Sequence, residues 1–197
     1  QPLLASAFLI SGALWLALAL FTWRATSRIP SLPQHACPDA PSVRVVIAAR
    51  DEADRIAGSI QRLLQQQRVD LELVLVDDRS TDDTSARALH AANGDPRFRI
   101  IRVNTLPDGW LGKCHALHLA AESLDRDWIA FLDADSWLAP DALARAIQLA
   151  RAERADHLCL IPGLGPTTLP GRAALTLFMM LFFIAAQRVN DDAPRAY

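Results

Sequence analysis

Short apolar runs alternate with amphipathic stretches between residues 43 and 160. The runs are short enough to be buried strands, and they lie at Val43–Ala48, Leu71–Val76, Phe98–Val103, Trp128–Leu132 and His157–Leu160. The stretches between them have apolar residues at helical spacing, over Asp51–Gln67, Thr81–Ala92, Lys113–Leu124 and Pro140–Glu153. This alternation predicts an α/β fold: a mostly parallel sheet with right-handed crossovers and helices on both faces.

The N-terminal end is more apolar than the middle of the chain. Leu3–Trp23 is an uncharged run of about twenty residues, which is long enough to cross a bilayer as a helix. Arg24 and Arg28 follow it, so the positive-inside tendency predicts one N-terminal transmembrane helix with the remaining chain facing the cytoplasm. A cleaved signal peptide is the alternative, although no Lys or Arg precedes Leu3.

Two further segments flank the predicted domain. Residues 24–42 are rich in proline and have little periodicity, which indicates an extended linker. Ala173–Ala186 is strongly apolar but short for a membrane span, so it is either a core helix or a helix in the membrane interface. The expected organisation is an anchor over 1–23, a linker over 24–42, a domain over 43–165 and an apolar helix within 166–197.

Composition excludes several classes of protein. The net charge is −2 and there is no basic stripe interleaved with aromatic residues, which argues against nucleic-acid binding. The three cysteines, Cys37, Cys114 and Cys159, are far apart and form no C-x-x-C pair. That spacing argues against a disulfide framework and a structural zinc site, and it fits a reducing compartment.

An acidic pair follows the fourth predicted strand. Trp128–Leu132 runs directly into Asp133-Ala134-Asp135. Parallel sheets bind ligands at the carboxyl ends of their strands, and two carboxylates there suit a hard divalent cation that also holds phosphate oxygens. The alternative is that Asp133 and Asp135 are loop and capping residues before the next helix.

Other strand ends also carry polar residues. The first strand leads into Ala49-Arg50-Asp51-Glu52, and neither a dinucleotide-binding glycine motif nor a phosphate-binding P-loop is present. The second ends in Asp77-Asp78, which could accept hydrogen bonds from a base or a ribose. Lys113 begins a predicted helix, where a cation is unfavourable unless an anion is also present. Lys113 is therefore a candidate diphosphate ligand, with an ordinary surface lysine as the alternative.

Taken in order, four of these motifs resemble the family 2 glycosyltransferases. They are Val46–Glu52, Val76–Thr84, Gly112-Lys113 and Phe131–Asp135, within residues 43 to 160. The resemblance implies a GT-A fold and a nucleotide-diphosphate sugar donor, with a UDP-sugar favoured, used with Mg²⁺ or Mn²⁺. The Gly-Trp-Leu-Gly-Lys segment and the expected anchor are similar to the membrane branch linked to hopanoid and carotenoid glycosylation. This similarity implies a membrane lipid or polyprenyl-type acceptor at a bacterial-type inner membrane.

The resemblance also implies roles for the nucleoside-binding residues. Asp51 and Glu52, with Ala49 before them, match the family's first motif in the wall of the nucleoside pocket. Asp77 and Asp78 match the pair that binds the base and ribose. The family usually has Asn where Asp51 stands.

The remaining positions concern the diphosphate and the metal. Lys113 matches a basic residue near the diphosphate, and His118 stands where the family usually has Asn. Asp133 and Asp135 match the D-x-D motif that holds the metal and the sugar's diphosphate, with Asp135 the more direct ligand. The metal would neutralise charge on the leaving diphosphate.

The family resemblance covers only a donor half. Its second half supplies the acceptor site and the general base, so we expect an N-terminal fragment with the base beyond Tyr197. The resulting hypothesis is an inverting glycosyltransferase. Two alternatives are a non-catalytic nucleotide-sugar-binding or scaffold module and a phosphotransferase with Asp133 as its nucleophile.

Overall fold

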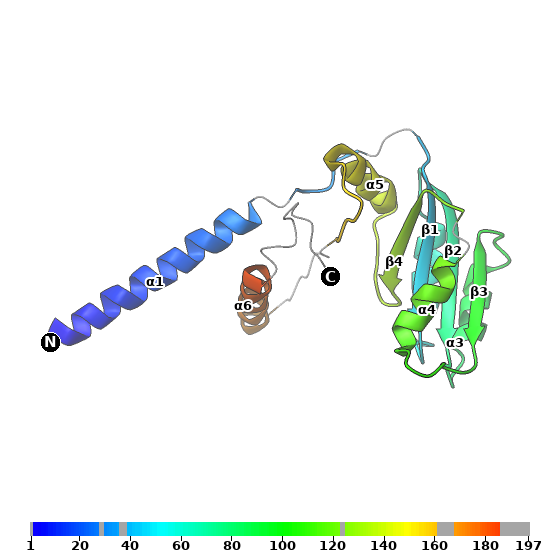
Figure 1. Cartoon of the computed structure of the whole chain (residues 1–197), viewed down its shortest axis with the longest axis horizontal. Helices are drawn as coiled ribbons and strands as arrows, with labels where there is room; N and C mark the ends of the chain where they lie inside the picture. The colour runs from blue at the N-terminus through cyan, green and yellow to red at the C-terminus, as the bar shows by residue number, and fades with distance from the viewer. Residues whose placement is uncertain (1, 28–29, 36–38, 123–124, 161–167, 186–197) are drawn as a thin grey trace. The chain divides into compact units, whose positions relative to one another are not determined.

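The computed structural model describes residues 2–27, 30–35, 39–122, 125–160 and 168–185 (Figure 1). The chain divides into two compact units, one made of Gln1–Ser31 with Ile161–Tyr197 and the other of Leu32–Leu160. The second unit contains the sheet and all the predicted site residues.

Four parallel strands form the sheet of the second unit. They are β1 (Ser42–Ala49), β2 (Asp70–Asp78), β3 (Phe98–Val103) and β4 (Trp128–Asp133), in the order β3-β2-β1-β4. This confirms the predicted parallel α/β sheet. The order reverses at β1, which lies between β2 and β4, and such a switch point is where open α/β sheets bind ligands.

The prediction of a fifth strand is wrong. His157–Leu160 has no regular secondary structure and its side chains are largely exposed. A strand needs a neighbour to pair its backbone groups, so a run of four residues does not define a strand on its own.

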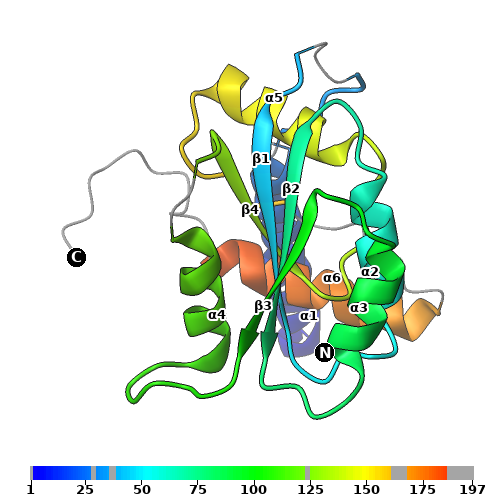
Figure 2. The same ribbon diagram turned by 90° about the vertical axis from the view of Figure 1, so that its right-hand side faces the viewer.

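Helices cover both faces of the sheet (Figure 2). On one face, β1 and β2 pack against α2 (Ile56–Leu64), α3 (Thr84–Ala92) and α5 (Ala142–Glu153). On the other face, Val46 and Val74 pack against Ala116 and Ala120 of α4 (Gly112–Ala121). Burial of both faces explains why the strands are continuous apolar runs rather than alternating ones.

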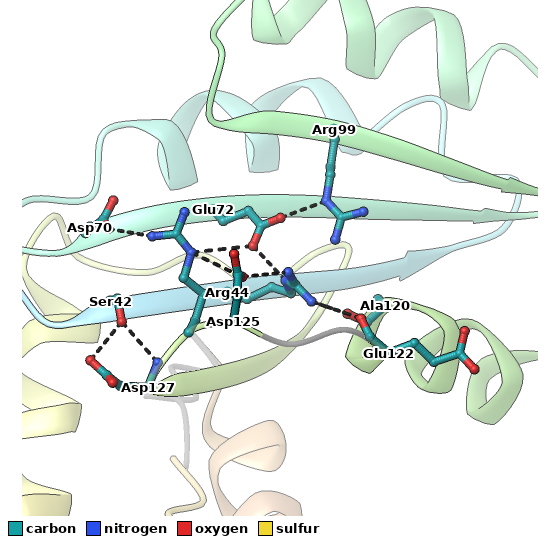
Figure 3. Close-up of polar contacts among 10 residues, drawn as sticks. Ser42, Arg44, Asp70, Glu72, Arg99, Ala120, Glu122, Asp125 and Asp127 are labelled. Atoms are coloured by element: carbon teal, nitrogen blue, oxygen red, sulfur yellow. Dashed lines mark hydrogen bonds and ion pairs between the residues drawn. The ribbon is translucent and has the colours of Figure 1, made fainter.

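A buried arginine fixes the far end of α4 to the sheet (Figure 3). Arg44 of β1 is 3% exposed, and its Nε donates to Glu72 of β2 at 2.7 Å. One terminal nitrogen donates to the carbonyls of Ala120 and Glu122 at 3.2 and 3.3 Å, and the other to Asp125 at 3.1 Å. Arg44 therefore satisfies carbonyls at the C-terminus of α4 that have no partner within the helix.

The same network sets the ionisation of Glu72. Burial alone would raise its pKa, but hydrogen bonds from Arg44 and Arg99 outweigh that effect and lower the pKa. Glu72 consequently stays charged in a largely buried position, and its two oxygens join three strands of the sheet.

The first unit contains α1 (Pro2–Thr26) and α6 (Leu169–Ala185), which cover the two apolar ends predicted from the sequence. Within the part of the chain that the structure describes, no helix is long and apolar enough to cross a membrane. The predicted transmembrane anchor is therefore not supported. Ala186, the last residue of the predicted apolar helix, lies outside the described residues.

Candidate active site at the carboxyl edge of the sheet

Apart from Lys113, the predicted site residues lie at or just after the ends of three neighbouring strands. Ala48 of β1 is paired with Val76 of β2 on one side and with Asp133 of β4 on the other. Asp78 ends β2 two residues after Val76, so Asp78 and Asp133 flank the end of β1. The topology thus brings two of the predicted motifs to the switch point of the sheet.

Asp77 and Asp78 point to opposite faces of the sheet because successive strand residues alternate. Asp77 is 8% exposed; one carboxylate oxygen accepts from the amide of Ser80 at 3.0 Å and the other from the hydroxyl of Ser85 in α3. Arg102 in turn donates to the Ser85 hydroxyl at 3.2 Å. Both oxygens of Asp77 are thus engaged by the protein, and this carboxylate joins β2 to α3.

Asp78 faces α4 and is held by its neighbour. Arg79 donates from Nε and Nη2 to the two carboxylate oxygens at 2.8 and 3.0 Å. This bidentate bond is the largest influence on Asp78 and lowers its pKa, against the opposing effect of burial. A Cβ placed on Gly112 would lie 2.3 Å from Asp78 Oδ2 and 2.8 Å from Arg79 Nη2. Only glycine therefore lets the start of α4 approach this pair so closely.

Lys113, the next residue, contacts the other acidic strand end. Its amine donates to Asp133 Oδ1, and both side chains are 62% exposed. The first turn of α4 thus lies against Asp78 through Gly112 and against Asp133 through Lys113. This environment suits an anion such as a diphosphate, because it combines the backbone amides at the N-terminus of α4 with the side chains of Lys113 and Arg79.

The loops after β1 and β2 are tied together by reciprocal hydrogen bonds. Asp51 has a φ of 55°, in the left-handed region that Asn and Asp tolerate better than most residues. Its amide donates to Ser80 Oγ at 3.0 Å, and its carboxylate accepts from the Thr81 amide at 2.7 Å. The amide of Glu52 donates to Thr84 Oγ1 at 2.8 Å. These bonds explain why α2 begins at Ile56 and not at Asp51 as predicted.

The two remaining predicted residues differ in exposure. Ala49, the last residue of β1, is buried, and its side chain belongs to the hydrophobic core. Asp135 is exposed in the turn after β4, where the amide of Ser136 donates to the carbonyl of Asp133 at 3.0 Å.

The D-x-D turn offers two carboxylates, those of Asp133 and Asp135, to a divalent cation. Among the described residues, no group of three or more His, Cys, Asp or Glu side chains is placed to hold a metal. Mg²⁺ and Mn²⁺ accept oxygen ligands, and Mg²⁺ is commonly bound by one or two carboxylates together with substrate phosphates and water. The exposed carboxylates of Asp133 and Asp135 fit that mode of binding.

Sequence analysis assigns no role to Arg79 or Trp110, which lie beside the site. The position of Arg79 directly after two aspartates is a signal for an ion pair. Trp110 stacks on His118 with ring centroids 5.0 Å apart and meets His115 edge-on at 5.4 Å. The one-turn spacing of the two histidines, next to a tryptophan, was the signal for this aromatic group.

Two surface hollows of this unit lie away from the strand ends. One of about 330 Å³ lies beside α5, between Pro41 and Ile147. Another, of about 280 Å³, is lined by Asp70, Glu72 and Arg126 near the start of β2. At the candidate site itself, Lys113, Asp133 and Asp135 are exposed to solvent, whereas Asp77 and Asp78 are buried.

The fold and this edge define the class of protein. The structure is similar to a mannosyltransferase from Pyrobaculum calidifontis solved in complex with GDP-Man and Mn²⁺, with a TM-score of 0.56 and 28% sequence identity. The match covers 74% of this chain and 43% of that one. The fold is therefore GT-A-like, as the resemblance implied.

Sequence comparison identifies the family. The model of glycosyl transferase family 2 matches residues 44–187, so the chain belongs to this family. It is 38% identical over 135 residues to the succinoglycan biosynthesis protein ExoO of Rhizobium meliloti (strain 1021), covering 68% of this chain and 36% of that protein. It is 34% identical over 110 residues to 4,4'-diaponeurosporenoate glycosyltransferase of Staphylococcus aureus (strain bovine RF122 / ET3-1), covering 54% and 27%. The chain thus spans about a third of the length of these curated relatives.

Proposed function

We propose that this chain forms the donor-binding part of a glycosyltransferase that transfers a sugar from a nucleotide-diphosphate sugar with the aid of Mg²⁺ or Mn²⁺. The observation that carries the proposal is the junction at the start of α4, where Gly112 lies against Asp78 and Lys113 binds Asp133. The similar mannosyltransferase, solved with GDP-Man and Mn²⁺, supports both the donor class and the cation.

Each part of the edge then has a role. The loops at Asp51 and Asp78 form the nucleoside side of the site, where Asp78 recognises the base or ribose and Asp77 supports the strand end. When the donor binds, Lys113 exchanges Asp133 for the diphosphate, and Asp133 then shares a cation with Asp135. When bound, the cation neutralises charge on the leaving diphosphate.

The acceptor we propose is a membrane lipid or polyprenyl-type molecule at the cytoplasmic face of an inner membrane. Large apolar side chains are exposed on α1, among them Phe8, Leu9 and Trp15, and on α6 at Phe178 and Leu181. Such side chains suit contact with lipid. The relative named for 4,4'-diaponeurosporenoate also supports a non-carbohydrate acceptor.

Inverting transfer requires a group that removes the proton from the acceptor hydroxyl. We assign that role to none of the residues described above. The donor-side proposal does not depend on it.

The test is transfer from labelled UDP- and GDP-sugars in the presence of Mn²⁺, with a bacterial lipid extract or water-soluble oligosaccharides as acceptors. We expect the label to enter the lipid fraction with release of nucleotide diphosphate. Label in the oligosaccharides would overturn the lipid acceptor, and release from no donor by the full-length protein would contradict the activity.

A further inference from the structure

The segment that follows the D-x-D motif is held along its length by α2 and the residues just after it. Ser59, Arg62 and Gln66 are three and four residues apart, so they lie along one side of α2 and its extension. Their partners are Ala134, Trp137 and Ala139, which follow one another along the loop between β4 and α5. One side of α2 therefore supports the whole loop.

Ser59 holds the middle residue of the D-x-D motif. Its side chain is fully buried, and its hydroxyl donates to the carbonyl of Ala134, which is itself 6% exposed. Asp133 and Asp135 on either side are exposed. A buried hydrogen bond thus fixes the peptide between two exposed carboxylates.

Two further contacts hold the rest of the loop. Gln66 is 5% exposed; its Nε2 donates to the carbonyl of Ala139 at 2.7 Å, and its Oε1 accepts from the amide of Leu143 at 3.3 Å. The guanidinium of Arg62 lies 3.9 Å from the centre of the Trp137 ring. The loop is therefore attached at both ends by buried polar side chains and in the middle by a cation–π contact.

We propose that Ser59 is a positioning residue for metal-dependent donor binding, acting through the Ala134 carbonyl to hold Asp133 and Asp135 in the orientation that a cation requires. This inference rests on the proposed function. Two carboxylates on an exposed turn have many relative orientations, and a cation shared with a diphosphate accepts few of them. Groups that orient ligands in this way typically change metal affinity by about 10- to 100-fold when they are removed.

The experiment compares Ser59→Ala with Ser42→Ala in the full 197-residue chain. Ser42 is the control. Its hydroxyl donates to the carboxylate of Asp127 at 2.8 Å, directly before β4 begins and so at the opposite end of that strand from the D-x-D motif. GDP and UDP binding are measured by calorimetry over a series of Mn²⁺ concentrations and in excess chelator. Amide hydrogen exchange at Ser136, which donates to Asp133, reports on the turn directly.

For Ser59→Ala we expect about a tenfold higher Mn²⁺ concentration at half-maximal nucleotide binding, unchanged binding in chelator and faster exchange at Ser136. Ser42→Ala should match the wild type. If Ser59→Ala does not fold by circular dichroism, Ser59→Cys keeps the volume with a weaker donor and should lie between the two.

An Mn²⁺ requirement in Ser59→Ala equal to that of the wild type would overturn the positioning role alone. Nucleotide binding by the wild type that does not respond to Mn²⁺, or no nucleotide binding at all, would overturn the metal-dependent donor site and the positioning role with it.

Discussion

The side-chain amine of Lys113 donates a hydrogen bond to the carboxylate of Asp133, so the first turn of α4 is joined to the end of β4. Lys113 is the single lysine among the 197 residues; every other member of the Lys and Arg group is arginine. A lysine at a helix N-terminus opposes the helix dipole, and Asp133 offsets that cost. The pair thus places a compact, mobile positive charge where we propose the diphosphate binds.

Replacing Lys113 with Gln should weaken binding of GDP and UDP by about 10- to 100-fold, because a hydrogen bond to a charged group contributes about 1.5–3 kcal/mol. Isothermal calorimetry measures the effect. Arg151→Gln, which removes an exposed cation paired with Asp39, is the control and should leave nucleotide affinity unchanged. Equal nucleotide affinities for the two variants would show that Lys113 does not contact the nucleotide.

A methyl group at Gly112 should disturb the Asp78–Arg79 pair. Gly112→Ala places a Cβ 2.3 Å from Asp78 Oδ2, so we expect a loss of about 1–3 kcal/mol in unfolding free energy and weaker nucleotide binding. Gly58→Ala in α2 is the control; it has nothing within 4 Å of the added Cβ and should be stabilising by up to about 1 kcal/mol. Urea unfolding measures the change in stability for each variant. Equal changes for Gly112→Ala and Gly58→Ala would mean that α4 moves to accommodate the added methyl group without cost.

The lowered pKa of Asp78 predicts an acid-dependent contribution to stability. The carboxylate binds Arg79 in the folded state, so its folded pKa lies below the unfolded value. Its contribution is therefore complete above the ordinary aspartate pKa of about 3.9 and is lost as the pH falls through the folded pKa. Asp78→Asn should be less stable than the wild type by about 1–3 kcal/mol at neutral pH.

The stability difference between Asp78→Asn and the wild type should narrow steadily in unfolding experiments below about pH 4. Asp156→Asn changes an exposed aspartate and serves as the control. A gap that stays constant with pH would mean that ionisation of Asp78 does not stabilise the fold.

Arg44 and Arg99 share Glu72 but differ in burial, which separates their effects on stability. Arg44→Met leaves Glu72 buried with fewer partners and removes the donor to α4, so we expect a loss of about 3–5 kcal/mol. Arg99 is 45% exposed, and Arg99→Met should change stability by at most about 1 kcal/mol. Thermal unfolding compares them, and equal losses would argue against burial as the cause.

Much of the fold follows from local sequence pattern. The four confirmed strands are apolar runs, and their order along the chain with intervening helices leads to a parallel sheet. The pattern failed at His157–Leu160, because a run of four residues does not reveal whether a neighbouring strand exists. It also failed at Asp51, where hydrogen bonds to Ser80 and Thr81 replace a helical turn.

The residues of the site were predictable from the sequence, but the contacts among them were not. Asp77 and Asp78 are equivalent in the sequence, and only the sheet register shows that Asp77 faces Ser85 while Asp78 faces Gly112. The bond between Lys113 and Asp133 depends on the return of the chain from β3 to the far side of β1. Contacts of this kind depend on tertiary structure, which local pattern does not encode.

The most direct test of the central claim is calorimetric binding of GDP and UDP with and without Mn²⁺. It compares the wild type with Asp135→Asn and with the control Asp156→Asn. We predict Mn²⁺-dependent binding to the wild type and to the control that is lost in Asp135→Asn. Binding that persists in Asp135→Asn with the same Mn²⁺ dependence would contradict a donor site at the end of β4.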